Sequence, residues 1–168
     1  MKRDDVTAEY IKSILSYDKE TGCFLWRIRK GIDVSSKNMP AGGLGSSWKY
    51  HRITIGKSVF LAHRLAWAIS YGEWPKLHID HINGDQSDNR LTNLREATVK
   101  DNCQNARRAR STSQSGLLGA YKIRGVNRWA AQIRTDNKIK HIGEFKTPEE
   151  AHAAYVNAKR LLHRFCTI

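Results

Sequence analysis

A stretch without regular apolar spacing divides this chain and limits what each part can fold into. Residues 106–117 begin with Arg among small residues and continue as Ser, Thr and Gly, with no apolar period for packing a helix or strand. The sequence therefore predicts two folded parts, residues 1–105 and 118–168, joined by a basic, flexible linker at 106–117.

Charge and composition narrow the class of partner. The 168 residues include 29 Lys and Arg against 16 Asp and Glu, and the net charge of +13 favours a polyanion, nucleic acid above all, over a merely basic surface. No apolar run approaches the roughly 20 residues that cross a bilayer, and the first ten residues do not resemble a signal peptide. We expect a cytoplasmic protein without membrane contact.

The first part alternates short helices and strands. Apolar residues at helical spacing predict a helix over 8–16, and a strand follows at 23–27. Residues 29–47 are rich in Gly and charge and are interpreted as a loop. Alternation around Gly56 predicts a hairpin over 50–61, and a helix over 63–70 ends before Gly72 and Pro75.

Polar chemistry is densest in the next thirty residues. Asp80 and His81 lie on an expected strand, Asn93 lies within a second expected strand over Leu91–Arg95, and Asn102 lies on a helix that begins at Val99. The order strand, loop, strand, helix is compact enough for a catalytic module. Adjacent residues of a regular strand point to opposite faces, so Asp80 and His81 share a site only if the backbone bends there.

These residue types fit hydrolysis of a phosphodiester. The reaction needs a deprotonated water and stabilisation of charge on the phosphate oxygens. Asp80 offers hard oxygen atoms to a magnesium ion, and neutral His81 can accept a proton near pH 7. An Asp-His pair alone is more often a solvated Asp beside a partly buried His. The full array with Asn93 and Asn102 favours a site.

The array resembles the HNH endonucleases of phage homing type, which have a ββα-metal fold. The resemblance rests on Ala62–Trp67, Ile79–Asp85, Asp88–Arg95, Asn102 and Asn105. It implies that Asp80 and Asn102 bind one divalent metal, that His81 is the general base and that Asn93 braces the loop. Asn102 stands where many relatives have His, which implies Mg²⁺, or Mn²⁺, over zinc or nickel. The resemblance also implies a phage or bacterial host cell.

Basic side chains around the array have two interpretations. For Arg64 and for Arg95, a salt bridge and a phosphate contact are equally plausible roles. Arg107, Arg108 and Arg110 lie in the linker and are expected to follow the phosphates of DNA. Packing is the better interpretation of His63, and His78 is more plausibly solvated or packed than a metal ligand.

The second part predicts a sheet covered by one helix. Strands are expected at 118–124, 128–135 and 138–145, and Thr147–Glu150 forms a capping box with Pro at the first helical position. Apolar residues spaced three or four apart should face the sheet: Ala151, Ala154, Tyr155, Ala158, Leu161, Leu162 and Phe165. Period-two alternation turns Trp129, Ala131 and Ile133 toward that helix, which leaves Arg128, Gln132 and Arg134 facing outward.

This second part resembles an AP2 domain at Gly119–Tyr121, Arg128–Arg134, Ile142–Phe145 and Glu149–Tyr155. The resemblance implies that the outer face of a three-stranded sheet enters the major groove, where Arg pairs with guanine and Gln with adenine. The candidate DNA contacts are Lys122, Arg124, Arg128, Gln132, Arg134, Lys140 and His141. A solvated basic face is the alternative.

Together these observations predict an α+β endonuclease that cuts double-stranded DNA with a divalent metal and no organic cofactor. No heptad or dimer face is visible, so we expect a monomer. Two alternatives stay open: a DNA-binding regulator without activity, and a structure-specific or RNA-directed nuclease. Intact Asp80, His81 and Asn102 oppose the first, and a sheet suited to the major groove of DNA opposes the second.

Overall fold

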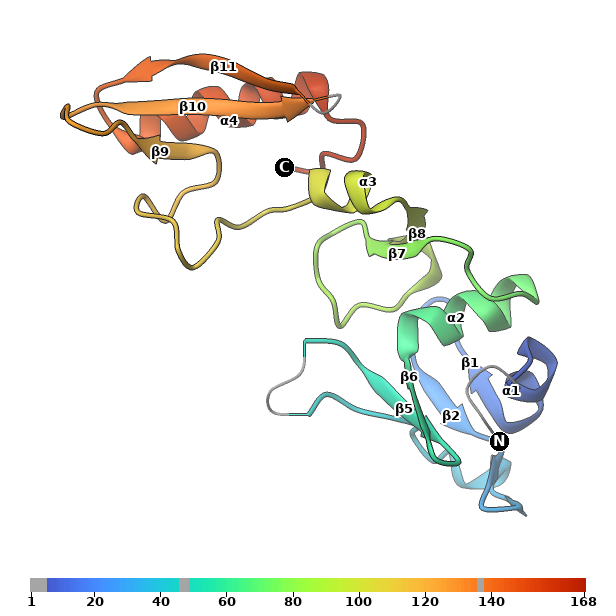
Figure 1. Ribbon diagram of the computed structural model, residues 1–168. Helices are drawn as coiled ribbons and strands as arrows, with labels where there is room; N and C mark the ends of the chain where they lie inside the picture. Colours follow the sequence, from blue (N-terminus) through green and yellow to red (C-terminus); the bar gives the residue numbers. More distant parts are fainter. Residues whose placement is uncertain (1–5, 46–48, 136–137) are drawn as a thin grey trace. The chain divides into compact units, whose positions relative to one another are not determined.

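The chain forms two compact units, Met1–Thr98 and Val99–Ile168, and each is described by itself. The computed structural model describes residues 6–45, 49–135 and 138–168 (Figure 1). The helix at Val99, which the sequence groups with the first part, falls within the second unit.

The first unit consists of short elements paired as antiparallel hairpins. Its elements are α1 (Ala8–Ile14), β1 (Leu15–Tyr17), β2 (Phe24–Trp26), β3 (Ile28–Arg29), β4 (Ile32–Asp33), the 3-10 helix η2 (Ser35–Lys37), β5 (Arg52–Ile55), β6 (Ser58–Leu61), α2 (Ala62–Tyr71), β7 (His78–His81), η3 (Leu91–Asn93) and β8 (Leu94–Ala97). Strands pair as β1 with β2, β3 with β4, β5 with β6, and β7 with β8. The expected strand at 23–27, the hairpin over 50–61 and the helix over 63–70 are all present.

Three expectations for this unit are wrong. The second strand of the polar array starts at Leu94 and not at Leu91, because Leu91–Asn93 form the 3-10 helix η3. The first helix ends at Ile14 and not at residue 16, because Leu15 adopts an extended conformation and pairs with Trp26 of β2. The expected loop contains the β3–β4 hairpin and η2, since Lys30 (φ 52°) and Gly31 (φ 78°) form its turn with the two positive φ angles of a tight hairpin. Residues 46 and 47 of that loop lie outside the described residues.

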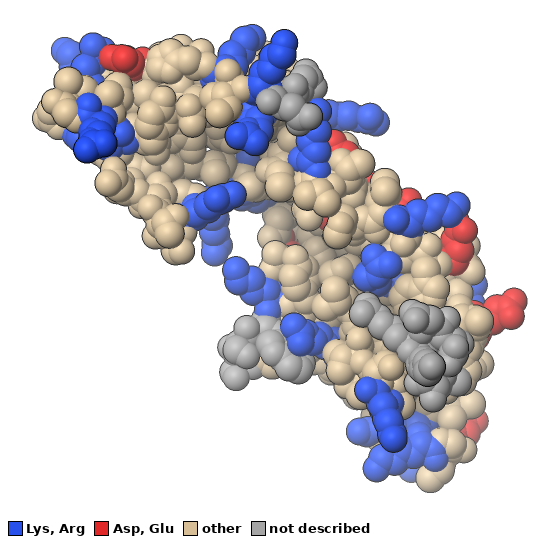
Figure 2. Space-filling view, in the orientation of Figure 1, with Lys and Arg blue, Asp and Glu red and all other residues tan. Residues whose placement is uncertain are grey.

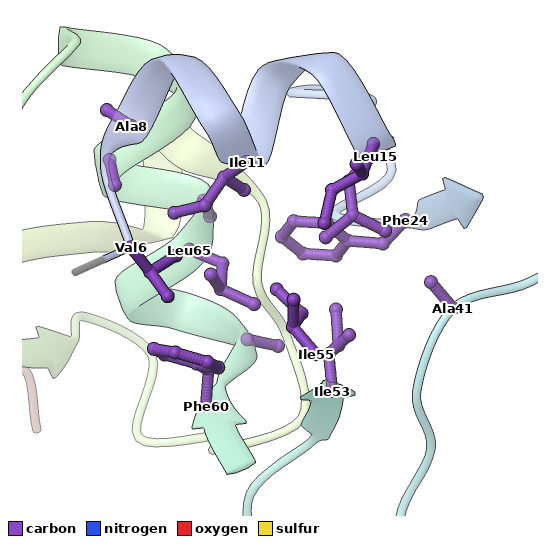
Figure 3. Close-up of a cluster of buried hydrophobic side chains, with 14 of the residues drawn as sticks. Val6, Ala8, Ile11, Leu15, Phe24, Ala41, Ile53, Ile55, Phe60 and Leu65 are labelled. Atoms are coloured by element: carbon purple, nitrogen blue, oxygen red, sulfur yellow. The ribbon is translucent and has the colours of Figure 1, made fainter. Parts of the chain in front are cut away.

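The core of the first unit lies between α1, α2 and the β5–β6 hairpin. Figure 3 shows Ile11 of α1 and Leu65 of α2 close to Ile53 and Ile55 of β5, and all four side chains are buried. The Trp74 ring stacks on Phe60 with centroids 5.7 Å apart. Helix α2 is thereby fixed on the hairpin, and the segment that follows it leads into β7.

The second unit is a three-stranded antiparallel sheet with a helix on one face. Its elements are α3 (Val99–Gln104), β9 (Ala120–Lys122), β10 (Trp129–Thr135), β11 (Lys138–Phe145) and α4 (Pro148–Leu162). The strand order is β11-β10-β9. Helix α4 begins with the expected capping box of Thr147 and Glu150. Of the helices in the described ranges, none is both long and apolar enough to cross a membrane.

The two faces of β10 divide as the alternation predicts. Ala131 and Ile133 are buried and Trp129 packs against the core, whereas Gln132 and Arg134 are exposed. Ala130 is buried as well, and the register of β10 with β11 shifts between Ala131 and Gln132. The exposed side chains of β10 itself, Gln132 and Arg134, are therefore polar.

The apolar face expected of α4 is wrong in its last turn. Leu161 is 86% exposed and Leu162 is also exposed, whereas Lys159 is only 1% exposed. The Lys159 ammonium donates to the backbone carbonyl of Ala106, which supplies the partner that a buried charge requires. Residues 106–117 contain no helix or strand, yet their first residues are held, because the Arg107 side chain also donates to Thr167.

Close packing in the second unit can be tested with two glycines of similar backbone conformation. A Cβ at Gly119 (φ +78°) would lie 2.0 Å from Cγ of Tyr155, whereas a Cβ at Gly125 (φ +81°) would meet nothing within 4 Å. Both Ala variants incur left-handed strain of about 1–2 kcal/mol, and overpacking adds about 1–3 kcal/mol at Gly119 only.

Gly119→Ala should therefore lower the free energy of unfolding more than Gly125→Ala does. Hydrogen exchange of the β10 amides in the two variants measures this difference within the second unit. Equal loss of protection in both would contradict the packing described here.

Candidate active site

Asp80 and His81 end β7 and are both buried, with 5% and 3% of their surface exposed. In the register with β8, Asp80 lies opposite Arg95 and His81 opposite Leu94. The backbone leaves the strand immediately afterwards, because the Gly84 amide donates to the carbonyl of His81 at 2.9 Å and Gly84 has a φ of 74°. The bend required for the two residues to serve one site thus begins at the right place.

Asp80 forms an ion pair with Arg95 on the neighbouring strand. Nε and Nη2 of Arg95 both donate to Oδ2 of Asp80, at 2.9 and 2.8 Å. Of the two interpretations given to Arg95 from the sequence, the structure shows the salt bridge. The guanidinium compensates the buried carboxylate and holds it in one orientation.

The ring of His81 is enclosed by other polar and aromatic side chains. Its Nε2 lies 3.3 Å from Oδ1 of Asn89, and the His63 ring meets it edge-on with centroids 5.1 Å apart. Tyr50 lies 6.0 Å away between ring centroids. Burial lowers the pKa of His81, although Asn89 and nearby carboxylates act in the opposite direction. His81 is therefore neutral at pH 7, the state in which an imidazole accepts a proton.

His63, on α2, is a buried neutral neighbour of His81. Burial, with smaller contributions from His81 and Arg64, lowers the pKa of His63 to about 3. Within the described part of the chain, its Nδ1 has no hydrogen-bond partner. A charge on this ring would face both desolvation and His81, so His63 stays neutral and fills space beside His81. This arrangement agrees with the packing role expected from the sequence.

Asn93 connects the two sides of the loop that follows His81. Its Oδ1 accepts from the amide of Asn83 at 2.9 Å, and its Nδ2 donates to the carbonyl of Asp88 at 2.8 Å. Its backbone carbonyl accepts from the amide of Ile82 at 2.9 Å. One buried amide side chain thus fixes a loop that begins at the candidate base.

Asn89 is the residue of this site that the sequence does not single out. It lies within the run Asp88–Arg95, but nothing in the spacing shows that its side chain turns toward His81. An Asn between two charged residues is ordinarily exposed, so the sequence gives no signal for Asn89. The structure shows instead that Asn89 is buried. Burial of an amide requires partners, and His81 is one of them.

Arg64, on α2, hydrogen-bonds to the backbone of the segment before β7. Its guanidinium donates to the carbonyls of Pro75 and Leu77, at 3.2 and 3.3 Å. His78, two residues before Asp80, is exposed. The structure thus brings Asp80, His81, Asn93 and Arg95 together in the first unit, with Arg64 bracing the strand that carries the first two.

The remaining candidates lie in the second unit. Asn102 is exposed on α3. Arg107, Arg108 and Arg110 are exposed in the segment after α3. On or beside the sheet, the exposed candidates are Arg124, Arg128, Gln132, Arg134, Lys140 and His141, and Lys122 is half-buried with its ammonium 4.9 Å from the Trp129 ring centroid.

The side chains at the end of β7 suit a hard cation better than a soft one. Among the described residues, no group of three or more His, Cys, Asp and Glu could hold a metal ion, and the free thiols of Cys23 and Cys103 are exposed. The Asp80 carboxylate offers oxygen atoms at this end of the strand, and oxygen ligands suit Mg²⁺ and Mn²⁺. A carboxylate has about four lone-pair directions, so the Arg95 bonds to Oδ2 are compatible with metal binding by Asp80.

Comparison with known proteins identifies the segment that holds this site. No curated protein matches the chain. Among solved structures, the chain is similar to the HNH homing endonuclease I-HmuI, described for DNA binding and cleavage, with 28% identity and a TM-score of 0.39. That match covers 55% of this chain and 51% of the other, so it spans about half of the solved protein. Residues 60–104, which include Asp80, His81, Asn93 and Asn102, match the family of HNH endonucleases.

Proposed function

We propose that this chain is a metal-dependent endonuclease that hydrolyses phosphodiester bonds in double-stranded DNA. The observation that supports it most is the pairing of a buried, neutral His81 with the ion-paired Asp80 at the end of β7, inside the segment that matches the HNH endonucleases. A neutral imidazole and a fixed carboxylate are the two groups that such a site requires from the protein.

Each residue has one role in the proposed reaction. His81 accepts the proton of the attacking water, and Asn93 keeps the loop in the shape that presents His81. Asp80 and Asn102 would hold a single Mg²⁺ or Mn²⁺ ion, and Arg95 fixes the orientation of Asp80 through its two bonds to Oδ2. When bound there, such an ion would supply stabilisation of the negative charge that develops on the phosphate oxygens and on the departing oxygen.

Recognition of DNA is assigned to the outward face of β9–β11. Figure 2 shows Lys and Arg side chains spread over the visible surface, and the net charge is +13. Gln132 and Arg134 project from the face of β10 that α4 does not cover. We propose an AP2-like domain that places this face in the major groove, while Arg107, Arg108 and Arg110 contact phosphates.

His81→Ala should abolish cleavage and preserve binding. Loss of a general base reduces a rate by about 10²–10⁴-fold. Supercoiled plasmid is incubated with wild type and variant, each with Mg²⁺ and with EDTA, and open-circular and linear products are separated on a gel. His78→Ala is the matched control, because His78 lies on the same strand and is exposed.

The same experiment distinguishes the alternative functions. A wild type that binds duplex DNA and cuts nothing with any metal would make the chain a regulator. Cleavage confined to branched or RNA-paired substrates would favour the structure-directed nuclease. Equal rates for His81→Ala and wild type would remove His81 from the mechanism.

The pH dependence of cleavage should follow the lowered pKa of His81. A base with a pKa below its ordinary value of 6.5 stays neutral as the pH falls from 8 to 6.5 and is protonated only below that. At saturating metal, the single-turnover rate should therefore be flat above pH 6.5 and decline beneath it. A midpoint above pH 6.5 that His81→Ala removes would contradict the burial of this ring.

Arg134→Ala should weaken binding to a duplex selected by the wild type from a random library. One bidentate base contact contributes about 1–3 kcal/mol, so the Kd should rise about 5- to 150-fold. Arg160→Ala is the control, because Arg160 is exposed on α4 and the helix covers the other face. Fluorescence anisotropy at several salt concentrations gives both values, and equal affinities for the two variants would contradict the assignment of this face.

A further inference from the structure

The contacts of Asn89 determine which end of its side chain faces His81. Asn89 is 3% exposed, and its Nδ2 donates to the backbone carbonyl of Ser87 at 3.2 Å. A carbonyl oxygen only accepts, so the amide nitrogen must face Ser87. The amide oxygen Oδ1 therefore faces Nε2 of His81 at 3.3 Å.

This orientation selects the tautomer of the imidazole. Because Oδ1 of Asn89 only accepts, Nε2 of His81 must carry the hydrogen that the contact uses. An imidazole that acts as a base is neutral and carries one such hydrogen. The lone pair is then on Nδ1, which becomes the atom able to take a proton from water.

We propose that Asn89 is a positioning residue of the nuclease reaction, and that the N-terminal β1–β2 hairpin holds Asn89 in place. Asn89 fixes His81 in the tautomer with Nε2–H and thereby makes Nδ1 the basic atom. This inference deepens the proposed function and rests on it.

The hairpin contacts the backbone of Asn89 directly. The Tyr17 hydroxyl, on β1, donates to the carbonyl of Asn89 at 2.7 Å, and the two residues are 72 positions apart in the chain. Burial raises the pKa of Tyr17, so its hydroxyl keeps the proton that it donates. The Tyr17 ring packs against Phe24 of β2 with centroids 4.8 Å apart, which fixes the hydroxyl relative to the hairpin.

The turn of the hairpin approaches the same backbone too closely for any side chain. Gly22 has a φ of +74°, and a Cβ there would lie 2.6 Å from the amide nitrogen of Arg90 and 2.7 Å from the carbonyl carbon of Asn89. The amide of Leu91 donates to the carbonyl of Lys19 at 3.0 Å, which closes the contact on the other side. Tyr17, Lys19 and Gly22 thus hold a short segment of the loop from its backbone.

Replacing the Asn89 amide tests the tautomer without depending on cleavage. In the wild-type chain, ¹⁵N chemical shifts of the His81 ring at pH 7.5 should show a protonated Nε2 and an unprotonated Nδ1. Asn89→Leu keeps the approximate shape and removes the acceptor, so the ring should populate both tautomers. Asn89→Asp retains an acceptor and should retain Nε2–H.

Kinetics then distinguish positioning from a general structural role. Asn89→Leu should lower kcat by about 10–100-fold, the range typical when the hydrogen-bond partner of a metal-bound His is removed. The Kd for duplex DNA and the melting temperature should stay near those of wild type, and Asn89→Asp should recover part of kcat. A fall in kcat with an unchanged tautomer and a large loss of stability would overturn the inference.

The hairpin is tested with variants outside the site. Tyr17→Phe removes one oxygen atom and should lower kcat less than Asn89→Leu does, with a partial shift of the His81 tautomer. Gly22→Ala displaces the Asn89–Arg90 backbone and should have a larger effect. Gly56→Ala is its control, because Gly56 also has a positive φ (+61°) and a Cβ there would meet nothing within 4 Å.

The outcomes separate this inference from the proposed function. A wild-type chain that cuts no DNA with Mg²⁺ or Mn²⁺ overturns the proposed function and, with it, the role of Asn89 in catalysis. A wild-type chain that cuts, while Asn89→Leu cuts at the full rate with an unchanged His81 tautomer, overturns only the inference. If Gly22→Ala fails to fold, the result for Tyr17→Phe tests whether the β1–β2 hairpin holds Asn89 in place.

Discussion

Burial of polar groups at the end of β7 is the constraint on which the candidate site depends. Asp80, His81, Asn89 and Asn93 are all withdrawn from water, and a buried polar group without a partner costs about 1–3 kcal/mol. Each must therefore be paired, and the partners come from β8 and from the loop itself. The same hydrogen bonds that make burial tolerable also fix the side chains in the orientation that the proposed chemistry requires.

The two histidines of the site illustrate how burial separates the roles of similar residues. His63 and His81 are both neutral because water is excluded, and their rings contact each other edge to face. Two imidazolium ions at this separation would repel, so neutrality is what permits the contact. Asn89 and nearby carboxylates oppose the effect of burial at His81 only. His81 is thus the ring better able to hold a proton during a reaction, and His63 serves as packing.

Local patterns predicted the elements better than their partners. The β5–β6 hairpin, α2 and the inward face of β10 follow from spacing that neighbouring residues determine. Lys30-Gly31 makes a hairpin turn without the Asn-Gly or Asp-Gly pair that usually signals one. The helical spacing of apolar residues predicted that Leu161 is buried, yet it is exposed. The spacing does not show where the sheet beneath α4 ends.

The site was predictable to the same extent and for the same reason. Asp80, His81 and Asn93 could be proposed because the chemistry of cleavage needs such residues in such an order. The salt bridge of Arg95 depends on the register of β7 with β8, and the contact of Asn89 depends on how a loop folds back. The contact of Tyr17 with Asn89 spans 72 positions, and no local pattern encodes it.

The two units relate folding to function in opposite ways. In the second unit, Ala131 of β10 packs with Ala151 of α4, and Gln132 and Arg134 are exposed, so the proposed recognition residues can change without disturbing the core. In the first unit the candidate residues are part of the interior, and the hydrogen bonds of Asn93 and Asn89 stabilise the loop as well as orient His81. Under the proposed function, specificity is therefore free to diverge on the sheet, whereas the candidate cleavage site is constrained by the stability of the fold.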